Sequence, residues 1–205
     1  MAYIKEAFYP SSIQHAMDIC LTPDSSNPNK FHDETKFLVD FLADQKLVNG
    51  ATQIADFGCG VGRVSKGLIN THGCNIVGFD ISMPMLTAAV VYVDDARFTP
   101  QVYNTAVPYT KQGTFDLVIA SLVLQHSENP IRDIRFIRTI LQDKGTLVLI
   151  NEKHRYVPVG VDDRSYVIWK DDGIDVFDEV SKQFSLVSEH QYYNRTDNAL
   201  TLWKK

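Results

Sequence analysis

Cysteine and basic residues are both scarce in this chain of 205 residues. The three cysteines, Cys20, Cys59 and Cys74, are an odd number and form no CxxC pair, so we predict reduced thiols, no disulfide framework and no structural metal. Twenty Lys and Arg residues against 25 Asp and Glu residues give a formal net charge of −5. A molecule of this charge is repelled by a phosphate backbone, which argues against nucleic acid as its main partner.

Long apolar runs and internal repeats are also missing. The longest apolar stretch, residues 117–124, contains Ser121 and is too short to cross a bilayer, and the N-terminus lacks a basic segment followed by an apolar run. No segment recurs at the period of about 20 to 50 residues that marks a repeat protein. We therefore expect a cytoplasmic protein that does not bind membranes, with a single domain over residues 1–205.

The pattern that is present, from residue 53 onward, is an alternation of short apolar runs with helical stretches. The runs are too apolar to have a face in water, which favours parallel strands covered by helices on both sides. The expected strands are residues 53–57, 75–79, 99–103, 115–121 and 145–151, and the expected helices are residues 61–71, 83–93 and 130–142. The middle of the chain is thus predicted to be a doubly wound α/β fold.

Both ends of the chain add to this core. Two helices are expected before it, at residues 12–20 and after a cap at Asp33. Beyond a long connection at residues 152–172 we expect a short helix near 173–182 and two strands around the turn 194–198, which must pair antiparallel because the turn is so short. The predicted fold class is a three-layer, doubly wound, seven-stranded mixed sheet with an antiparallel last strand and N-terminal accessory helices.

The most informative stretch is residues 54–63, where an apolar strand runs into a glycine-rich turn and then a helix. Glycines at 58, 60 and 62 allow positive φ and let a ligand lie against the backbone. The dinucleotide fingerprint GxGxxG needs a glycine at 63, where this chain has Arg63. The next strand ends in Asp80, 22 residues after Gly58, where a carboxylate can accept hydrogen bonds from both hydroxyls of a ribose.

These residues resemble the class I S-adenosylmethionine-dependent methyltransferases. The resemblance rests on residues 56–62, 78–86, 115–126 and 141–150 in this order, and it extends from about residue 50 to the C-terminus. It implies S-adenosylmethionine as cofactor, S-adenosylhomocysteine as product, and N- or O-methylation of a small-molecule acceptor. It also implies that residues 51–205 form the cofactor-binding core and residues 1–50 a helical segment on the substrate side.

The resemblance also implies a role for each residue of the cofactor site. Asp56 would meet the methionyl ammonium group, and Asp80 the ribose hydroxyls. Gly58, Cys59, Gly60 and Gly62 would line the methionyl and ribose portion, Ile81 and Met85 would pack on adenine, and Ser121 would face the sulfur. Asn104 and Thr105 stand where the family usually has an acidic residue and a small one to read the adenine amine.

The catalytic group is less well defined, because methyl transfer depends mainly on positioning and needs a base only when the acceptor must lose a proton. His126, shortly after the fourth strand, is the candidate general base, and a structural bond within its loop is the alternative. The fourth strand ends without the aspartate of the magnesium-dependent enzymes, so no metal is expected. The acceptor site is expected in residues 1–50 and 152–172, with candidate lining residues Tyr9, Phe31, His32, His154, Tyr156 and Tyr166.

Three other functions stay open at this point. The chain could bind S-adenosylmethionine without turnover, methylate a peptide or protein, or be a nicotinamide-dependent oxidoreductase, against which Arg63 counts. The sequence has no Asn-Pro-Pro-Tyr segment and no Pro-Cys pair, which argues against the DNA methyltransferases. Whether the protein is a monomer or a homodimer is also left open.

Overall fold

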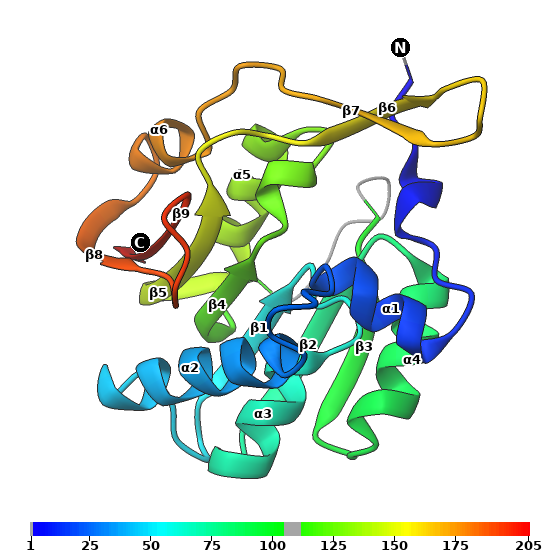
Figure 1. The fold of residues 1–205 in the computed structure, drawn as a ribbon. Coiled ribbons are helices and arrows are strands. Elements are labelled where there is room, and N and C mark those ends of the chain that lie inside the picture. Colours follow the sequence, from blue (N-terminus) through cyan, green and yellow to red (C-terminus); the bar gives the residue numbers. More distant parts are fainter. Residues whose placement is uncertain (1, 105–111) are drawn as a thin grey trace. The chain divides into compact units, whose positions relative to one another are not determined.

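The computed structural model describes residues 2–104 and 112–205 (Figure 1). The chain divides into two compact units, unit 1 with Met1–Ala7 and Tyr109–Lys205, and unit 2 with Phe8–Pro108. The main sheet has seven strands in the order β3-β2-β1-β4-β5-β9-β8, and a separate two-stranded sheet is formed by β6 and β7. This order and the antiparallel β9 confirm the predicted fold class.

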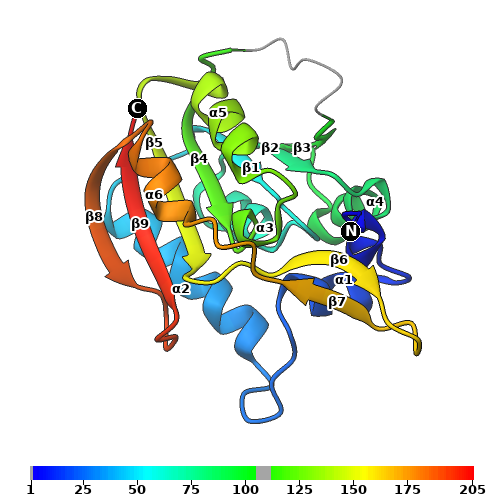
Figure 2. The same ribbon diagram turned by 90° about the horizontal axis from the view of Figure 1, so that it is seen from above.

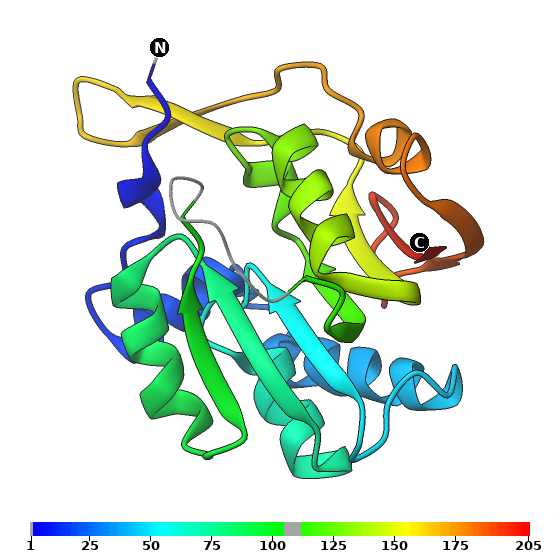
Figure 3. The ribbon, with the colours of Figure 1, turned by 180° about the vertical axis from the view of Figure 1, so that it is seen from behind.

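Unit 2 holds the first three strands in parallel pairs, β1 with β2 and β2 with β3. Helices α3 and α4 pack against β2 and β3, as Figure 3 shows, while α2 contacts α3 and α1 contacts α4. The elements of this unit are α1 (Ile13–Cys20), α2 (Lys30–Asp44), β1 (Gln53–Phe57), α3 (Arg63–His72), β2 (Asn75–Asp80), α4 (Met83–Val93) and β3 (Phe98–Val102).

Local signals set most of these boundaries. The side chains of Ser12 and Ser82 accept hydrogen bonds from backbone N–H groups in the first turns of α1 and α4, so both serines are N-caps. The predicted cap of α2 is wrong: Asn29 precedes this helix, and Asp33 lies in its first turn. An acidic side chain there still favours the helix through its dipole, which explains why Asp33 resembled a start signal.

Unit 1 holds the other strands of the main sheet. Strand β5 pairs parallel with β4 and antiparallel with β9, and β9 pairs antiparallel with β8, so the predicted C-terminal hairpin is confirmed. The elements are β4 (Phe115–Ser121), η2 (Leu124–His126), α5 (Pro130–Ile140), β5 (Leu141–Glu152), β6 (Val157–Val161), β7 (Val167–Lys170), α6 (Val176–Ser181), β8 (Ser185–Gln191) and β9 (Asn198–Lys204). A short 3-10 helix, η1 (Lys5–Phe8), lies near the N-terminus.

The connection at residues 152–172 contains the β6–β7 hairpin, which the sequence did not predict (Figure 2). Pro158 and Gly160 interrupt the apolar pattern of β6, and the pairing register shifts between these two residues. The N–H of Ile4 donates to the carbonyl of Pro158 at 3.0 Å, so the N-terminal segment of unit 1 is hydrogen-bonded to this hairpin. Among the helices of the described ranges, none combines the length and the apolar character that crossing a bilayer requires.

Candidate functional site

The glycine-rich turn between β1 and α3 is hydrogen-bonded to the carboxyl end of β2. Its glycines at 58, 60 and 62 have φ values of 71°, 56° and 80°, in the left-handed region that favours glycine. The N–H groups of Gly58 and Cys59 both donate to the carbonyl of Phe79, at 2.8 and 2.9 Å. The turn is therefore fixed beside the residue that follows Phe79, which is Asp80.

Asp80 is half-buried and hydrogen-bonded to the turn. Its Oδ2 atom accepts from the N–H of Gly60 at 3.1 Å and its Oδ1 atom from the N–H of Ser82 at 2.9 Å. Burial raises the pKa of this carboxyl from 3.8 to about 6, although these N–H donors oppose the shift. The structure thus brings the second strand's carboxylate and the glycine turn together, as the sequence predicts.

Asp56, the acid before the turn, is buried and held by α3. Its Oδ2 atom accepts from the hydroxyl of Ser65 at 2.7 Å. Burial raises the pKa of Asp56 to about 6, and the hydrogen bond from Ser65 and the charge of Arg63 oppose this shift. The charge of Asp56 also contributes to the raised pKa of Asp80, so the two carboxyls lie within electrostatic reach of each other.

Helix α1 packs directly on the glycine turn through Cys20. The N–H of Val61 donates to the Sγ atom of Cys20 at 3.2 Å, and a Cβ atom on Gly60 would lie only 2.2 Å from that sulfur. Gly60 therefore lacks a side chain because α1 needs the space, a reason that the sequence did not show. Burial raises the pKa of Cys59 well above its ordinary value, so this thiol stays protonated and is a poor nucleophile.

The residues predicted to contact adenine differ in exposure. Met85 is 2% exposed and packs with Ala16 and Val61, whereas Ile81 is 36% exposed. The N–H of Tyr103 donates to the carbonyl of Asp80 at 2.8 Å, which brings the exposed Asn104 close to the end of β2. Thr105 lies outside the described residues.

Unit 1 carries Ser121 at the carboxyl end of β4. Its Oγ atom is buried and has no hydrogen-bond partner among the described residues. Leu122 follows with φ 56°, an uncommon value for a branched side chain, and its N–H donates to the carbonyl of Ile150 at 2.8 Å. A strained residue and an unsatisfied hydroxyl at the end of a parallel strand are features of ligand-binding positions.

His126 lies in η2, just after β4, and its tautomer follows from its contacts. Its Nδ1 atom lies 2.8 Å from the carbonyl oxygen of Tyr156, which can only accept, so Nδ1 carries the proton. Its Nε2 atom lies 3.4 Å from Nε2 of Gln125, and therefore presents its lone pair on that side. Burial lowers the pKa of His126 below its ordinary 6.5, and the charge of Arg155 adds to the effect while the bond to Tyr156 opposes it. This imidazole is neutral near pH 7 and can accept a proton.

Two aromatic rings accompany His126, and the sequence prediction missed one of them. The ring of Trp169 in β7 lies 5.5 Å from the imidazole in an edge-to-face arrangement, and the ring of Tyr156 lies 6.5 Å from it. The two residues are 42% and 41% exposed. Trp169 could have been found only by recognising the hairpin, in which it pairs with Pro158, two residues after the predicted lining residue Tyr156.

Arg155 fixes the loop that bears His126, a role that no pattern in the sequence indicates. The side chain is 1% exposed. Its guanidinium group donates to the carbonyls of Leu124 and Ser127, both at 2.6 Å, and to both carboxylate oxygens of Asp172, at 2.7 and 3.0 Å. These bonds join both ends of η2 to the segment that precedes α6.

The other predicted lining residues fall in both units. In unit 2, Phe31 packs edge-on to His32 and Tyr92, while Tyr9 lies near the start of that unit. In unit 1, His154 lies 3.1 Å from a carboxylate oxygen of Asp171, and Tyr166 is 68% exposed.

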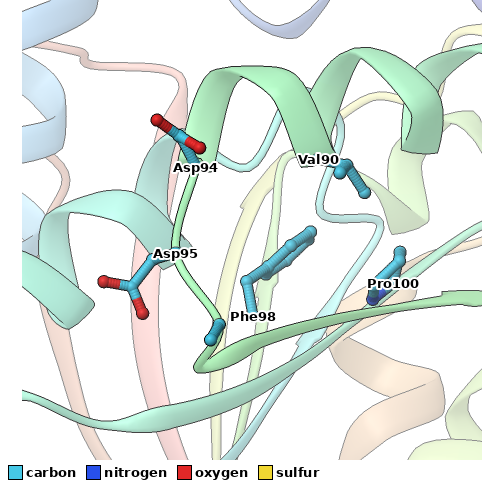
Figure 4. Close-up of a pocket in the computed structure, with 6 residues that line it drawn as sticks. Val90, Asp94, Asp95, Phe98 and Pro100 are labelled. Carbon is cyan, nitrogen blue, oxygen red and sulfur yellow. The ribbon is translucent and has the colours of Figure 1, made fainter.

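A pocket of about 420 Å³ lies between α4 and β3 (Figure 4). Its walls are Val90, Asp94, Asp95, Ala96, Phe98 and Pro100. None of these residues belongs to the predicted site.

The chain matches the sequence profile of a family described as a methyltransferase domain over residues 28–192. No protein of curated function matches its sequence. Three solved structures resemble its fold. PH0226 protein from Pyrococcus horikoshii OT3 is 20% identical with a TM-score of 0.68, covering 89% of this chain and 94% of its own.

The other two solved structures are more distant in sequence. An S-adenosylmethionine-dependent methyltransferase from Mesorhizobium loti is 17% identical with a TM-score of 0.59, covering 82% of this chain and 98% of its own. The 4+2 cyclase SpnF is 16% identical with a TM-score of 0.65, covering 82% and 79%. At these identities the likeness concerns the fold.

Proposed function

The chain belongs to the methyltransferase domain family, and on that basis we propose that it transfers the methyl group of S-adenosylmethionine to an N–H or O–H group of a small-molecule acceptor. The family and the fold imply this cofactor. The observation that carries the proposal is the hydrogen bond between the Asp80 carboxylate and the turn at Gly60, because it joins a hydroxyl-binding acid to a backbone that a nucleoside can approach.

The described residues fit the cofactor chemically. The half-buried carboxylate of Asp80 retains lone pairs for two ribose hydroxyls, and the buried carboxyl of Asp56 supplies a negative charge for the methionyl ammonium. Gly58, Cys59, Gly60 and Gly62 supply the backbone of the turn, and Ile81 supplies exposed apolar surface for adenine. Because Met85 is buried against Ala16 and Val61, its part is to support Val61 in the turn.

The protein's share of the chemistry is mainly to position groups. Bound S-adenosylmethionine supplies an electrophilic methyl group on a sulfonium. Asn104 belongs to the proposed cofactor site in unit 2, and the roles of Ser121 and Thr105 remain expectations from the sequence. In this proposal Nε2 of His126 takes the proton of the acceptor, since Nδ1 donates to the carbonyl of Tyr156.

A second candidate function is cofactor binding without methyl transfer. The resemblance to a protein named as a cyclase supports this possibility, because one fold can serve different reactions. Incubation with tritiated S-adenosylmethionine and a fractionated metabolite extract separates the two. We expect label in the small-molecule fraction with the wild type and less label with Asp80→Ala at a cofactor concentration near the wild-type Kd. Label in the peptide fraction would identify a peptide acceptor. No label in either fraction would support cofactor binding without methyl transfer.

Replacing Asp80 with Ala is expected to weaken S-adenosylhomocysteine binding by about 1 to 3 kcal/mol, or roughly 5- to 150-fold, since two charge-assisted bonds are lost. Calorimetric titration measures this change. Asp163→Ala is the control, since Asp163 is an exposed residue of the β6–β7 hairpin and should leave the affinity unchanged. Equal affinities in wild type and Asp80→Ala would refute the assignment.

The raised pKa values of Asp56 and Asp80 predict a pH dependence of binding. The cofactor-binding form has ionised carboxylates, so affinity should rise as pH increases through about 6 and level off above it. Between pH 7 and pH 5 we expect a loss of about 10-fold for each carboxylate that must ionise. In the absence of cofactor, the stability of the protein should depend on pH in the opposite direction. A carboxyl whose pKa is raised from 3.8 to about 6 binds more protons in the folded state, so the free energy of unfolding should fall as pH rises across this interval. An affinity that does not change between pH 5 and pH 7 would contradict this account.

A further inference from the structure

The pocket between α4 and β3 lies wholly within unit 2 and shares no residue with the cofactor site. Its volume of about 420 Å³ is in the range of about 300 to 1,000 Å³ that small-molecule sites have. The buried ring of Phe98 forms its floor and fills the space that Gly78 leaves by having no side chain. A Cβ atom on Gly78 would lie only 2.5 Å from Cε2 of this ring. The floor of the pocket is therefore fixed against the sheet.

The walls of the pocket are apolar. Figure 4 shows the side chains of Val90, Phe98 and Pro100 around the space between α4 and β3. Val90 is 47% exposed, and α4 carries no charged residue from Met83 to Val93. Because contact with water is unfavourable for such a surface, it favours a ligand with an apolar body.

The edge of the sheet beside the pocket argues against a strand from another protein as the occupant. Strand β3 is the first strand of the main sheet, and an edge strand can pair with a partner strand. The N–H of Tyr103 and the carbonyl of Arg97 bond to β2, so the alternation along β3 directs the nitrogen of Pro100 away from β2. This nitrogen has no proton to donate, which interrupts pairing in the middle of β3. A small molecule is the occupant that these walls favour.

One end of the pocket is acidic. Asp94 and Asp95 follow α4, and Figure 4 shows their carboxylates at this end, directed away from the apolar walls. The guanidinium of Arg97 donates to both carboxylate oxygens of Asp95, at 2.8 and 2.6 Å. Lys66 bonds to the carbonyl of Tyr92 in the last turn of α4. Asp94 is exposed and has no ion pair in the part of the chain that the structure describes.

The charge at this end is therefore incomplete. Two carboxylates against the one guanidinium of Arg97 leave one negative charge uncompensated, and it lies at the C-terminus of α4, where the helix dipole disfavours it. A ligand with a single positive charge would compensate it. The apolar walls and the acidic end together describe a molecule with an apolar body and an ammonium group.

We propose that this pocket binds a small organic cation with one positive charge on an apolar body. The body lies against Val90, Phe98 and Pro100, and the ammonium group extends past the end of α4 to the carboxylate of Asp94. The inference goes beyond the proposed function, because it concerns a second site that takes part in no methyl transfer.

The test is a titration of the full-length protein with three probes, followed by the NMR shifts of its backbone amides. The probes are 2-phenylethylammonium, its uncharged counterpart 2-phenylethanol, and ethylammonium, which lacks the ring. We expect 2-phenylethylammonium to bind about 2- to 5-fold more tightly than 2-phenylethanol, as for one exposed ion pair, and at least about 10-fold more tightly than ethylammonium. Equal binding of 2-phenylethanol would show an apolar pocket without cation recognition. Equal binding of ethylammonium would show a bare cation site, and absence of binding would show no site; each result overturns the proposal.

Matched variants localise the apolar body of the probe. Val90→Trp and Val91→Trp make the same change at neighbouring exposed residues of α4, of which only Val90 lines the pocket. Val90→Trp fills the pocket and should weaken binding of 2-phenylethylammonium at least about 10-fold, whereas Val91→Trp should leave it unchanged. Equal losses in these two variants overturn the proposal. Saturating S-adenosylhomocysteine should not change the affinity of the probe, since competition would place the probe in the cofactor site and also overturn it.

A second pair of variants tests the charge. Asp94→Asn removes the carboxylate at a position with φ 51°, which Asn tolerates. It should weaken 2-phenylethylammonium binding about 2- to 5-fold and leave 2-phenylethanol binding unchanged. Asp44→Asn is the control, because Asp44 is also an exposed acid at the C-terminal end of a helix, α2. Unchanged binding in Asp94→Asn, or an equal loss in Asp44→Asn, overturns the proposal.

Discussion

Replacing Arg155 with Met should lower the free energy of unfolding by about 3 kcal/mol, the low end of the range for breaking a buried ion pair, because the Asp172 side chain is 37% exposed. The variant keeps most of the side chain's volume but removes the guanidinium donor from the carbonyls of Leu124 and Ser127. It also leaves the carboxylate of Asp172 without its bidentate partner. Urea unfolding, followed by circular dichroism, measures the loss.

The control for this prediction is Arg164→Met, which removes an exposed arginine from the turn of the β6–β7 hairpin. Its effect should stay within about 0.5 kcal/mol, as for most surface substitutions. The pKa of His126, followed by the NMR titration of its ring, should rise in Arg155→Met because the charge of Arg155 lowers it in the wild type. Equal stability of the two arginine variants would mean that the buried guanidinium does not fix the His126 loop.

Replacing Gly60 with Ala should destabilise unit 2 by about 2 to 5 kcal/mol and weaken cofactor binding with it. Two effects add at this position. An L-residue in the left-handed region costs about 1 to 2 kcal/mol, and overpacking costs about 1 to 3 kcal/mol more because the new Cβ atom would lie 2.2 Å from the sulfur of Cys20. Thermal unfolding and S-adenosylhomocysteine titration give the two readouts.

Two further variants separate strain from overpacking. Gly113 also has a positive φ, 59°, but a Cβ there would have no neighbour within 4 Å, so Gly113→Ala should show the strain alone. In a Cys20→Ala background the nearest atom to the new Cβ at residue 60 is 3.7 Å away, an ordinary contact. The double variant should therefore recover the overpacking part of the loss, as a positive coupling in a double-mutant cycle. Strict additivity would show that α1 does not pack on the turn as described.

The strand and helix pattern of the core was readable from the sequence because each element carries its own signal. The helix at Met83–Val93 and the strand at Phe115–Ser121 have the predicted bounds, since a serine cap and a continuous apolar run mark them locally. The β6–β7 hairpin was not readable, because Pro158 and Gly160 hide its alternation and its pairing depends on a partner strand.

The candidate site likewise has features that could be predicted from the sequence and features that could not. The proximity of Asp80 and the glycine turn follows from a general rule on parallel strands, so spacing alone predicted it. The contact of Cys20 with Val61 spans 41 residues, and the bonds of Arg155 to Leu124 and Ser127 span 31 and 28. Such contacts depend on tertiary packing and leave no periodic trace in one sequence. The resemblance implies that Met85 packs on adenine, and this stays a prediction; its burial against Ala16 and Val61 could not be read from the sequence.

The central claim is that Asp80 and the turn at Gly58, Gly60 and Gly62 bind S-adenosylmethionine rather than a nicotinamide dinucleotide. Calorimetric titration of the wild-type protein with S-adenosylhomocysteine and, separately, with NAD⁺ tests it most directly. The account predicts saturable one-to-one binding of S-adenosylhomocysteine and none of NAD⁺ at the same concentrations. Saturable binding of NAD⁺, or no heat from S-adenosylhomocysteine, would contradict it.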